Sequence, residues 1–369
     1  MFRFRTIQIS ESGAEDGQAA ADSYFEWRQD IAVAQLAGDW TRVQELLEDK
    51  AENPVCNAAL QRQFYLMMQG HVRKRLSRDF AESAALYEQA IRITIPDFPC
   101  QMSDSILLNV QEIMLLLFWQ AVQPDKRYSG ELLKFLEQYV PAHFRDEQVT
   151  IKIYPKIVSA YLPFLLEQGK YTECFSMAEK TIDMMVSSAY ASCMQTVLHF
   201  YIQAAEKIGR EQGLPEKRVQ LAAWKELMDA FGQSGDDNAE NELLPDVWQE
   251  IELLRHYQES RVRLEFHYRT AMLIVVHLSQ CTGVMKNYVK ELKYSEEGIR
   301  LHMISGARKL LPTCVNNLAD ALENMGQKEK ALKFYRLAFY SAELMKREGT
   351  AKVARRSYEK LLGREIQWY

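Results

Sequence analysis

The chain is poor in the residues that interrupt helices. Its 369 residues include 16 Gly and 10 Pro, together about 7% of the chain, whereas average usage is roughly 12%. This shortage favours long helices. Because 47% of the residues are hydrophobic, material for a core is ample. The sequence therefore predicts an all-α fold.

Long apolar runs and a surplus of positive charge are also missing. The most apolar run, Ile106 to Val122, is interrupted by Asn109, Gln111 and Glu112, and these residues are costly inside a lipid bilayer. We therefore expect no contact with a membrane. The 45 Lys and Arg against 50 Asp and Glu give a net charge of −5. That balance supplies no general attraction to phosphate backbones and excludes a nucleic-acid coat protein.

Export signals and cysteine motifs are absent as well. Residues Met1 to Asp22 contain no apolar stretch followed by a small-residue cleavage site. The 6 cysteines form no CxxC pair and have no histidine partner at zinc-finger spacing. We expect a cytoplasmic protein with reduced thiols.

Recognisable catalytic motifs do not occur. The sequence has no HExxH, no GxSxG and no phosphate-binding glycine loop, and its 7 histidines lack metal-ligand spacing. We therefore expect no catalytic residues, no metal and no cofactor. The prediction is a protein that is not an enzyme.

One helix pair is clear near the carboxy terminus. From Pro312, which suits a first helical turn, a helix of about 13 residues runs to Gly326, and a second helix follows at once. Small residues bracket a large one in the second helix, so the two helices can approach closely. The spacing resembles the tetratricopeptide repeat (TPR), a helix-turn-helix unit, and the residues that carry the resemblance are Leu318, Ala319, Leu322, Gly326, Ala331, Tyr335 and Ala338.

Degenerate copies of the same turn occur upstream. They begin at Gly38-Asp39-Trp40, Asp79-Phe80 and Gly169-Lys170-Tyr171, and a weaker fifth copy begins at Gly283-Val284-Met285. A sixth candidate copy, with a longer lead-in, runs from Tyr128 to Tyr139. The resemblance implies a TPR-like right-handed α-solenoid of about six to eight helix pairs.

One segment departs from the helical pattern. Gly232 to Glu242 holds no large apolar residue, so burial cannot offset its ordering entropy. We expect a flexible tail at 1–22, a first arm of repeats at 23–231, a mobile acidic loop at 232–242 and a second arm at 243–369 that ends in a basic helix.

The carboxy-terminal stretches add a second resemblance. Glu297 to Ile299, the repeat from Pro312, Ser341 to Met345 and Arg355 to Glu359 resemble the end of Gram-positive helix-turn-helix regulators, and Ile31 to Pro54 is similar to the first repeat of such proteins. These are the RRNPP quorum-sensing receptors and their XRE-type relatives. The resemblance implies a sensor region that binds a short peptide or protein segment on its concave face and forms a homodimer.

Only about 25 residues precede the first repeat, and a helix-turn-helix domain needs roughly 60. This argues against direct contact with nucleic acid. One reading is a regulator whose DNA-binding part is lost or lies on another chain. The alternatives are an interaction scaffold and a response-regulator inhibitor or phosphatase without a helix-turn-helix domain.

The best ligand candidates lie on the first helix of the clear pair. An apolar stripe of Val315, Leu318, Ala319, Leu322 and Met325 faces away from a polar stripe that contains Thr313, Asn316, Asn317 and Asp320. An Asn amide can pair with both backbone groups of an extended peptide whatever its side chains. The alternative is that this stripe is solvated helix surface.

The spacing between the polar stripe and its turn, counted back from the other turns, gives further candidate ligand-binding residues on the concave face. They are Thr270, His277, His267, His199, Gln203 and Lys156. A basic and amide-lined groove suits a peptide carboxylate or acidic side chains. Each histidine taken singly can instead be packed or solvent-facing.

Positive charge gathers in two places. Arg73, Lys74, Arg75 and Arg78 cluster at an expected helix end, where cations favour the helix dipole, so we expect a structural role for them. Residues Lys346 to Arg364 carry a net charge of +5. That tail helix could meet an acidic partner, or it could be a solvated cap on the last repeat.

Overall fold

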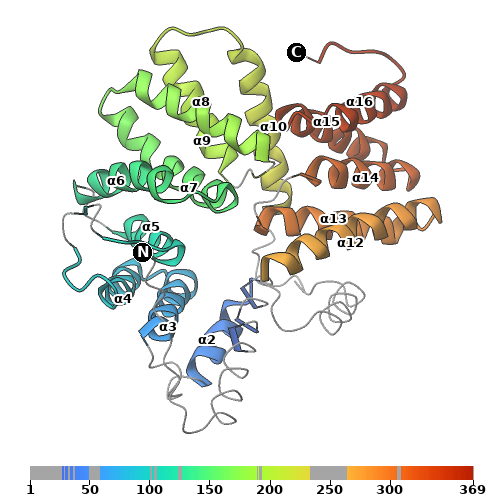
Figure 1. Cartoon of the computed structure of the whole chain (residues 1–369). Coiled ribbons are helices and arrows are strands. Elements are labelled where there is room, and N and C mark those ends of the chain that lie inside the picture. Colours follow the sequence, from blue (N-terminus) through green and yellow to red (C-terminus); the bar gives the residue numbers. More distant parts are fainter. Residues whose placement is uncertain are drawn as a thin grey trace. The chain divides into compact units, whose positions relative to one another are not determined.

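The protein is all-helical in the part that the structure describes. The computed structural model describes residues 27–28, 30–31, 34–35, 38–49, 59–99, 102–103, 106–123, 127–188, 190, 193–232, 264–305 and 309–368. These residues form fourteen α-helices and no strand, which confirms the expected all-α class (Figure 1). The predicted tail at 1–22 lies outside the described residues, as does the predicted acidic loop apart from Gly232.

The chain divides into two compact units, Met1–Lys126 and Arg127–Tyr369. The predicted boundary at the acidic loop falls outside the described residues and stays a prediction. The helices of the first unit are α2 (Trp40–Asp49), α3 (Ala59–Val72), the π-helical turn η2 (Arg73–Ser77), α4 (Phe80–Arg92) and α5 (Val110–Val122).

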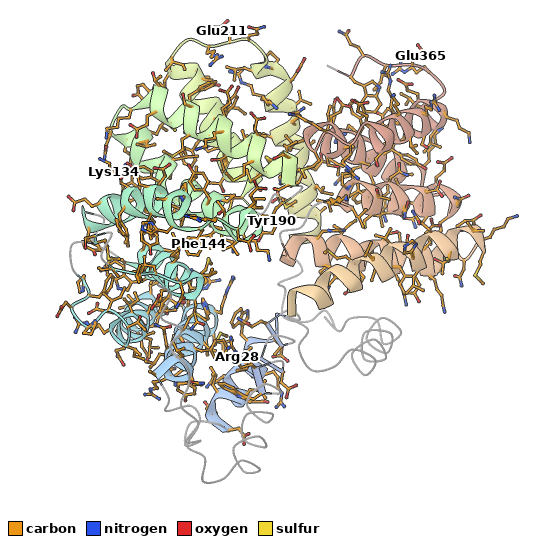
Figure 2. The ribbon with its side chains drawn as sticks, in the orientation of Figure 1. Arg28, Lys134, Phe144, Tyr190, Glu211 and Glu365 are labelled. Atoms are coloured by element: carbon orange, nitrogen blue, oxygen red, sulfur yellow. The ribbon has the colours of Figure 1, made fainter. Side chains whose placement is uncertain are left out.

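The second unit contains ten of the helices. They are α6 (Arg127–His143), α7 (Glu147–Glu167), α8 (Tyr171–Ser188), α9 (Met194–Lys207), α10 (Leu214–Gly232), α12 (Leu264–Val284), α13 (Tyr288–Ser305), α14 (Leu311–Asn324), α15 (Lys328–Leu344) and α16 (Glu348–Leu362). Within the run from α6 to α10, consecutive helices pack against each other, and the same holds within the run from α12 to α16. Helix α10 also packs against α13 and α15. The turn between α9 and α10 contains Glu211, and side chains fill the spaces between neighbouring helices (Figure 2).

Residues in the left-handed conformation lie at several of the turns that the sequence predicts. Gly38, Gly169 and Gly326 have φ of 75°, 72° and 79°, a region that glycine enters without a Cβ clash. The next helix then begins two residues later, at Trp40, Tyr171 and Lys328. The short turn makes consecutive helices into hairpins.

The small and large residues that follow each turn are buried. In α15 the side chains of Ala331, Tyr335 and Ala338 are fully buried. Their counterparts after the other turns are also buried: Val43 and Leu47 in α2, Ser83, Tyr87 and Ala90 in α4, and Cys174, Ala178 and Thr181 in α8. The spacing seen in the sequence therefore marks the face on which each second helix packs.

The turn expected at Gly283-Val284-Met285 was misplaced by three residues. Gly283 lies inside α12, and the left-handed residue is Lys286, with φ of 58°. Asn287 then caps α13, because its Oδ1 accepts the N–H of Lys290 at 3.3 Å. Gly283 serves packing instead, since a Cβ there would overlap the carboxyl of Glu291. The pattern Lys286-Asn287-Tyr288 matches the other turns, with Lys in place of Gly.

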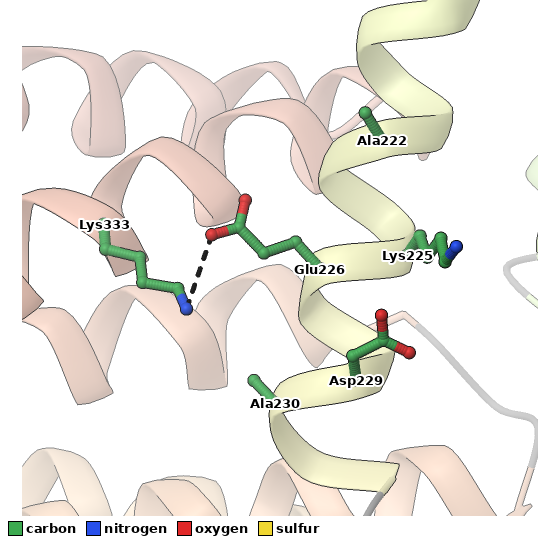
Figure 3. A pocket seen from close by; sticks show the side chains of 6 residues that line it. All are labelled: Ala222, Lys225, Glu226, Asp229, Ala230 and Lys333. Atoms are coloured by element: carbon green, nitrogen blue, oxygen red, sulfur yellow. Dashed lines mark ion pairs between the residues drawn. The ribbon is translucent and has the colours of Figure 1, made fainter.

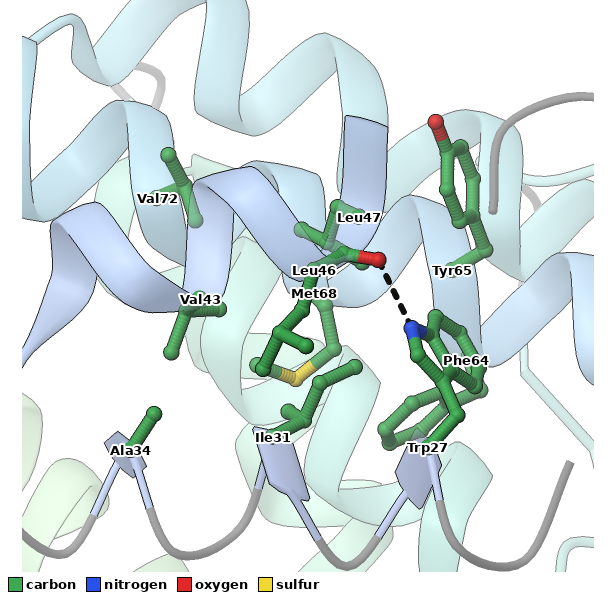
Figure 4. Packing of buried hydrophobic residues seen from close by; sticks show 10 residues of the cluster. All are labelled: Trp27, Ile31, Ala34, Val43, Leu46, Leu47, Phe64, Tyr65, Met68 and Val72. Atoms are coloured by element: carbon green, nitrogen blue, oxygen red, sulfur yellow. Dashed lines mark hydrogen bonds between the residues drawn. The ribbon is translucent and has the colours of Figure 1, made fainter. Parts of the chain in front are cut away.

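The first unit has its own apolar core (Figure 4). Trp27 and Ile31 pack with α2 and α3, and the Trp27 indole N–H donates to the carbonyl of Leu46 at 2.7 Å. The rings of Trp27 and Phe64 meet edge to face at 5.9 Å. A buried indole with a satisfied N–H stabilises this contact between segments distant in sequence.

A capping box starts α5. The Asn109 Oδ1 accepts the N–H of Glu112 at 3.0 Å, and the Glu112 Oε2 accepts the N–H of Asn109 at 2.8 Å. Asn109→Ala is expected to lower the free energy of unfolding by about 0.5–2 kcal/mol, because the N–H of Glu112 in the first helical turn loses its acceptor. Urea denaturation followed by circular dichroism checks this. An unchanged midpoint would show that the box contributes nothing.

One helix in the described part of the chain, Val149–Glu167, is long and apolar enough to cross a membrane. The most apolar run of the sequence, Ile106 to Val122, contains the shorter helix α5 instead. In α7 the side chains of Ile153, Ile157 and Leu162 are buried, and the helix packs against α6, α8 and α9. The buried face of α7 therefore belongs to the packed interior of the second unit.

Candidate functional site

Helix α14 has one apolar face and one polar face, as the sequence predicted. Val315, Leu318, Ala319 and Leu322 are buried, whereas Met325 is 38% exposed at the helix end and does not belong to the buried stripe. On the opposite side Thr313, Asn316 and Asn317 are half-buried and Asp320 is exposed. We call Thr313, Asn316, Asn317 and Asp320 the polar row.

Asn317 belongs to a hydrogen-bonded chain across three helices. Its Nδ2 donates to the Ser279 hydroxyl of α12 at 3.3 Å, and that hydroxyl lies 2.7 Å from the Ser295 hydroxyl of α13. Ser279 and Ser295 are both buried. Asn317 is therefore partly engaged inside the protein, and its amide orientation is fixed by this chain.

Asn316 carries an unsatisfied acceptor. Its Oδ1 is buried and has no hydrogen-bond partner among the described residues. A buried polar atom without a partner is costly, and native proteins usually satisfy it with water or a ligand. The polar row thus combines one oriented amide and one unsatisfied carbonyl on adjacent residues.

Two carboxylates share one tyrosine hydroxyl at the end of the row. The Tyr335 hydroxyl donates to Glu323 Oε2 at 2.7 Å and lies 3.3 Å from Asp320 Oδ1. Asp320 is exposed as a residue, yet partial desolvation of its carboxyl raises its pKa, with a further contribution from the charge of Glu323. Burial raises the pKa of Tyr335 far above its ordinary value, so the phenol remains a donor at neutral pH.

Glu291 is a buried carboxyl that sequence reasoning missed. It lies on α13 and is 3% exposed, and its Oε2 has no hydrogen-bond partner among the described residues. Burial, followed by the charge of Asp320, raises its pKa to about 7. The signal was present in the sequence. Counted from Lys286-Asn287-Tyr288, Glu291 occupies the position that Ala331 and Cys174 hold in the other copies.

The remaining candidates lie on three other helices. His277 on α12 and His199 on α9 are exposed, and Gln203 on α9 and Lys156 on α7 are half-buried. The side chains of His267 and Thr270 lie outside the described residues, although both positions are in α12. No hydrogen bond or ion pair in the described part of the chain links His277, His199 or Gln203 to the polar row.

The structure also shows an open pocket that the sequence did not indicate. It has a volume of about 460 Å³ and lies beside α10 and α15 (Figure 3). Its lining residues are Ala222, Lys225, Glu226, Asp229, Ala230 and Lys333. The Glu226 carboxylate lies 3.4 Å from Lys333 Nζ and 2.7 Å from an Arg336 nitrogen. These ion pairs join the two helices, and a lining of both charge signs favours no single ligand charge.

Groups for metal or thiol chemistry are few in the described part of the chain. No three His, Cys, Asp or Glu side chains there are arranged to hold a metal ion. Four cysteines are described, all as free thiols, and burial raises the pKa of Cys174 to about 11. A thiol with that pKa is a poor nucleophile at neutral pH.

Comparison of the sequence with known protein families finds no matching family model, and comparison with curated proteins finds no matching sequence.

Proposed function

We propose that this chain is a non-catalytic, cytoplasmic, TPR-like right-handed α-solenoid that binds a short peptide or protein segment. Consecutive helices form hairpins across left-handed turns, and the small and large residues after those turns are buried. Both features support stacked helix pairs of the tetratricopeptide type. The role in peptide-responsive regulation, through a DNA-binding partner or a homodimer, rests on the resemblance of the carboxy-terminal stretches.

The polar row of α14 is the observation that carries the proposal. Its two adjacent Asn side chains lie opposite the buried stripe, one with a fixed amide and one with a carbonyl that has no hydrogen-bond partner among the described residues. An extended peptide offers alternating N–H and C=O groups, so it can satisfy such amides irrespective of its own side chains. Thr313 and Asp320 extend the row along the same face.

Peptide titration tests the assignment. Peptides selected from a random library on the full chain would be titrated calorimetrically into wild type, Asn317→Ala and the control Gln212→Ala, which removes an exposed amide in the α9–α10 turn. Loss of one or two peptide contacts is expected to weaken binding about tenfold, or about 1.4 kcal/mol, in Asn317→Ala. The control should bind within about twofold of wild type.

Circular dichroism would establish that Asn317→Ala is folded, because this substitution also removes the bond to Ser279. Equal affinity in wild type and folded Asn317→Ala would remove the polar row as the peptide site. Failure to select any binding peptide would contradict the proposed function itself.

A further inference from the structure

A cluster of cations follows α3 in the first unit. Arg73, Lys74 and Arg75 lie on the π-helical turn η2, and Arg78 ends that turn in the left-handed conformation with φ of 52°. Arg73, Arg75 and Arg78 are exposed and Lys74 is half-buried. We call these four residues the basic turn. π-Helical turns are rare and occur frequently at functional sites.

The residues that the structure describes neutralise little of this charge. Arg73 lies 3.2 Å from Glu82, and both side chains are nearly half exposed, so the pair is weak. Arg75 lies over the ring of Trp40 at 5.5 Å. Lys74 and Arg78 form no ion pair among the described residues. The nearest further carboxylate along the chain, Asp79, caps α4 by accepting the N–H of Glu82 at 2.9 Å.

Interaction with the dipole of α3 explains only part of this cluster of cations. Cations near a helix carboxy terminus are favoured by the dipole, but this effect fades within one turn. It also does not explain the apolar side chains beside the cations. Leu76 is 44% exposed and Phe80 is 50% exposed. Basic side chains and exposed apolar side chains therefore lie together within the short segment 73–80.

From this juxtaposition we infer that the basic turn, with Leu76 and Phe80, is a docking surface for an acidic protein segment that carries an aliphatic side chain. Carboxylates would pair with Lys74, Arg75 and Arg78, and the aliphatic group would cover Leu76 and Phe80. Charge complementarity selects an acidic occupant, and the exposed apolar pair selects one that is not purely charged. This surface lies in the first unit and does not involve the polar row.

Nucleic acid fits the same surface less well. The chain as a whole has a net charge of −5, which opposes a long polyanion. The Trp40 ring, the best stacking platform nearby, is already covered by Arg75. His71, which contacts Trp40, adds no positive charge, because burial and then Lys74 and Arg75 lower its pKa to about 4.

The test is fluorescence anisotropy with three labelled probes and the full chain. The probes are a ten-residue acidic peptide with two leucines, the same peptide with serines in place of the leucines, and single-stranded DNA of ten nucleotides. The variant Arg75→Gln with Arg78→Gln removes two exposed charges of the basic turn. Its matched control, Lys352→Gln with Arg356→Gln, removes two exposed charges from α16.

The inference predicts that wild type binds the leucine peptide at least about fivefold more tightly than the serine peptide and than DNA. The basic-turn variant should bind the leucine peptide at least about fivefold more weakly, and the α16 control within about twofold of wild type. A second variant, Leu76→Ser, keeps every charge and should lose the preference for leucine. Circular dichroism would verify that all variants are folded.

Three results would overturn the inference. One is absence of leucine-peptide binding by wild type, and another is an equal loss of affinity in the basic-turn variant and the α16 control. The third is DNA binding that is as tight as peptide binding and equally sensitive to the basic-turn variant, which would assign the surface to nucleic acid.

Discussion

Glu291→Gln is expected to raise the free energy of unfolding at pH 8 by about 1–3 kcal/mol. The Glu291 side chain is buried beneath Gly283 of α12, and one of its oxygens has no hydrogen-bond partner among the described residues. Its pKa is raised from 4.5 to about 7 in the folded protein. At pH 8 folding must therefore bury an ionised carboxylate, and the neutral amide of Gln removes this cost.

The pH dependence of wild type has a definite sign. Between pH 4.5 and about 7 the folded state retains a proton on Glu291 that the unfolded chain has released. The contribution of this residue to stability therefore falls as pH rises through that interval and is constant above it. The neighbouring Asp320, whose pKa is also raised, acts in the same direction.

Urea denaturation at a series of pH values measures this effect. Wild type should lose stability from about pH 5 to about pH 8 more steeply than Glu291→Gln. Glu131→Gln is the matched control, because it removes an exposed carboxylate on α6, and its slope should equal that of wild type. Parallel slopes for wild type and Glu291→Gln would show that Glu291 is not a buried acid.

Gly70→Ala is expected to lower the free energy of unfolding by about 1–3 kcal/mol. Gly70 lies on α3 where the Tyr87 ring of α4 packs directly on the backbone, and a Cβ would overlap that ring. Tyr87 cannot move freely, because it is fully buried and its hydroxyl bonds to His71 Nδ1 at 2.8 Å. The clash should outweigh the usual helix-propensity gain of about 1 kcal/mol.

Gly349→Ala is the matched comparison for this prediction. Gly349 also lies in a helix, α16, and a Cβ there would meet nothing within 4 Å. This substitution should stabilise the chain by about 0.5–1 kcal/mol. Thermal unfolding of both variants measures whether each substitution stabilises or destabilises the chain. Stabilisation by Gly70→Ala would mean that α3 and α4 pack less closely than the contact between Gly70 and Tyr87 implies.

Local sequence rules predicted the turns because their chemistry is local. The turn needs a residue that tolerates the left-handed conformation, followed by a capping or helix-starting residue. Three consecutive positions are enough to recognise it, as at Gly38, Gly169 and Gly326. The same rule misplaced the turn between α12 and α13, because Lys286 there adopts the left-handed conformation that glycine usually supplies. The nearby Gly283 was misleading because its small size serves contact with Glu291.

Partners distant in sequence could not be predicted in the same way. The two faces of α14 follow from helical periodicity, but the hydrogen bond between Asn317 and Ser279 joins residues 38 positions apart. The pairing of Glu226 with Arg336 spans 110 positions. Such contacts depend on how α10, α12, α14 and α15 pack, which no residue pattern within one helix specifies.

The most direct test of a ligand-binding polar row is site-specific photo-cross-linking of a selected peptide to the full chain. A photoreactive phenylalanine would replace Asp320, which is exposed on α14, and in a second variant Glu131, which is exposed on α6. Our account predicts a peptide adduct at position 320 and none at position 131. A bound peptide that forms adducts at 131 and not at 320 would contradict it.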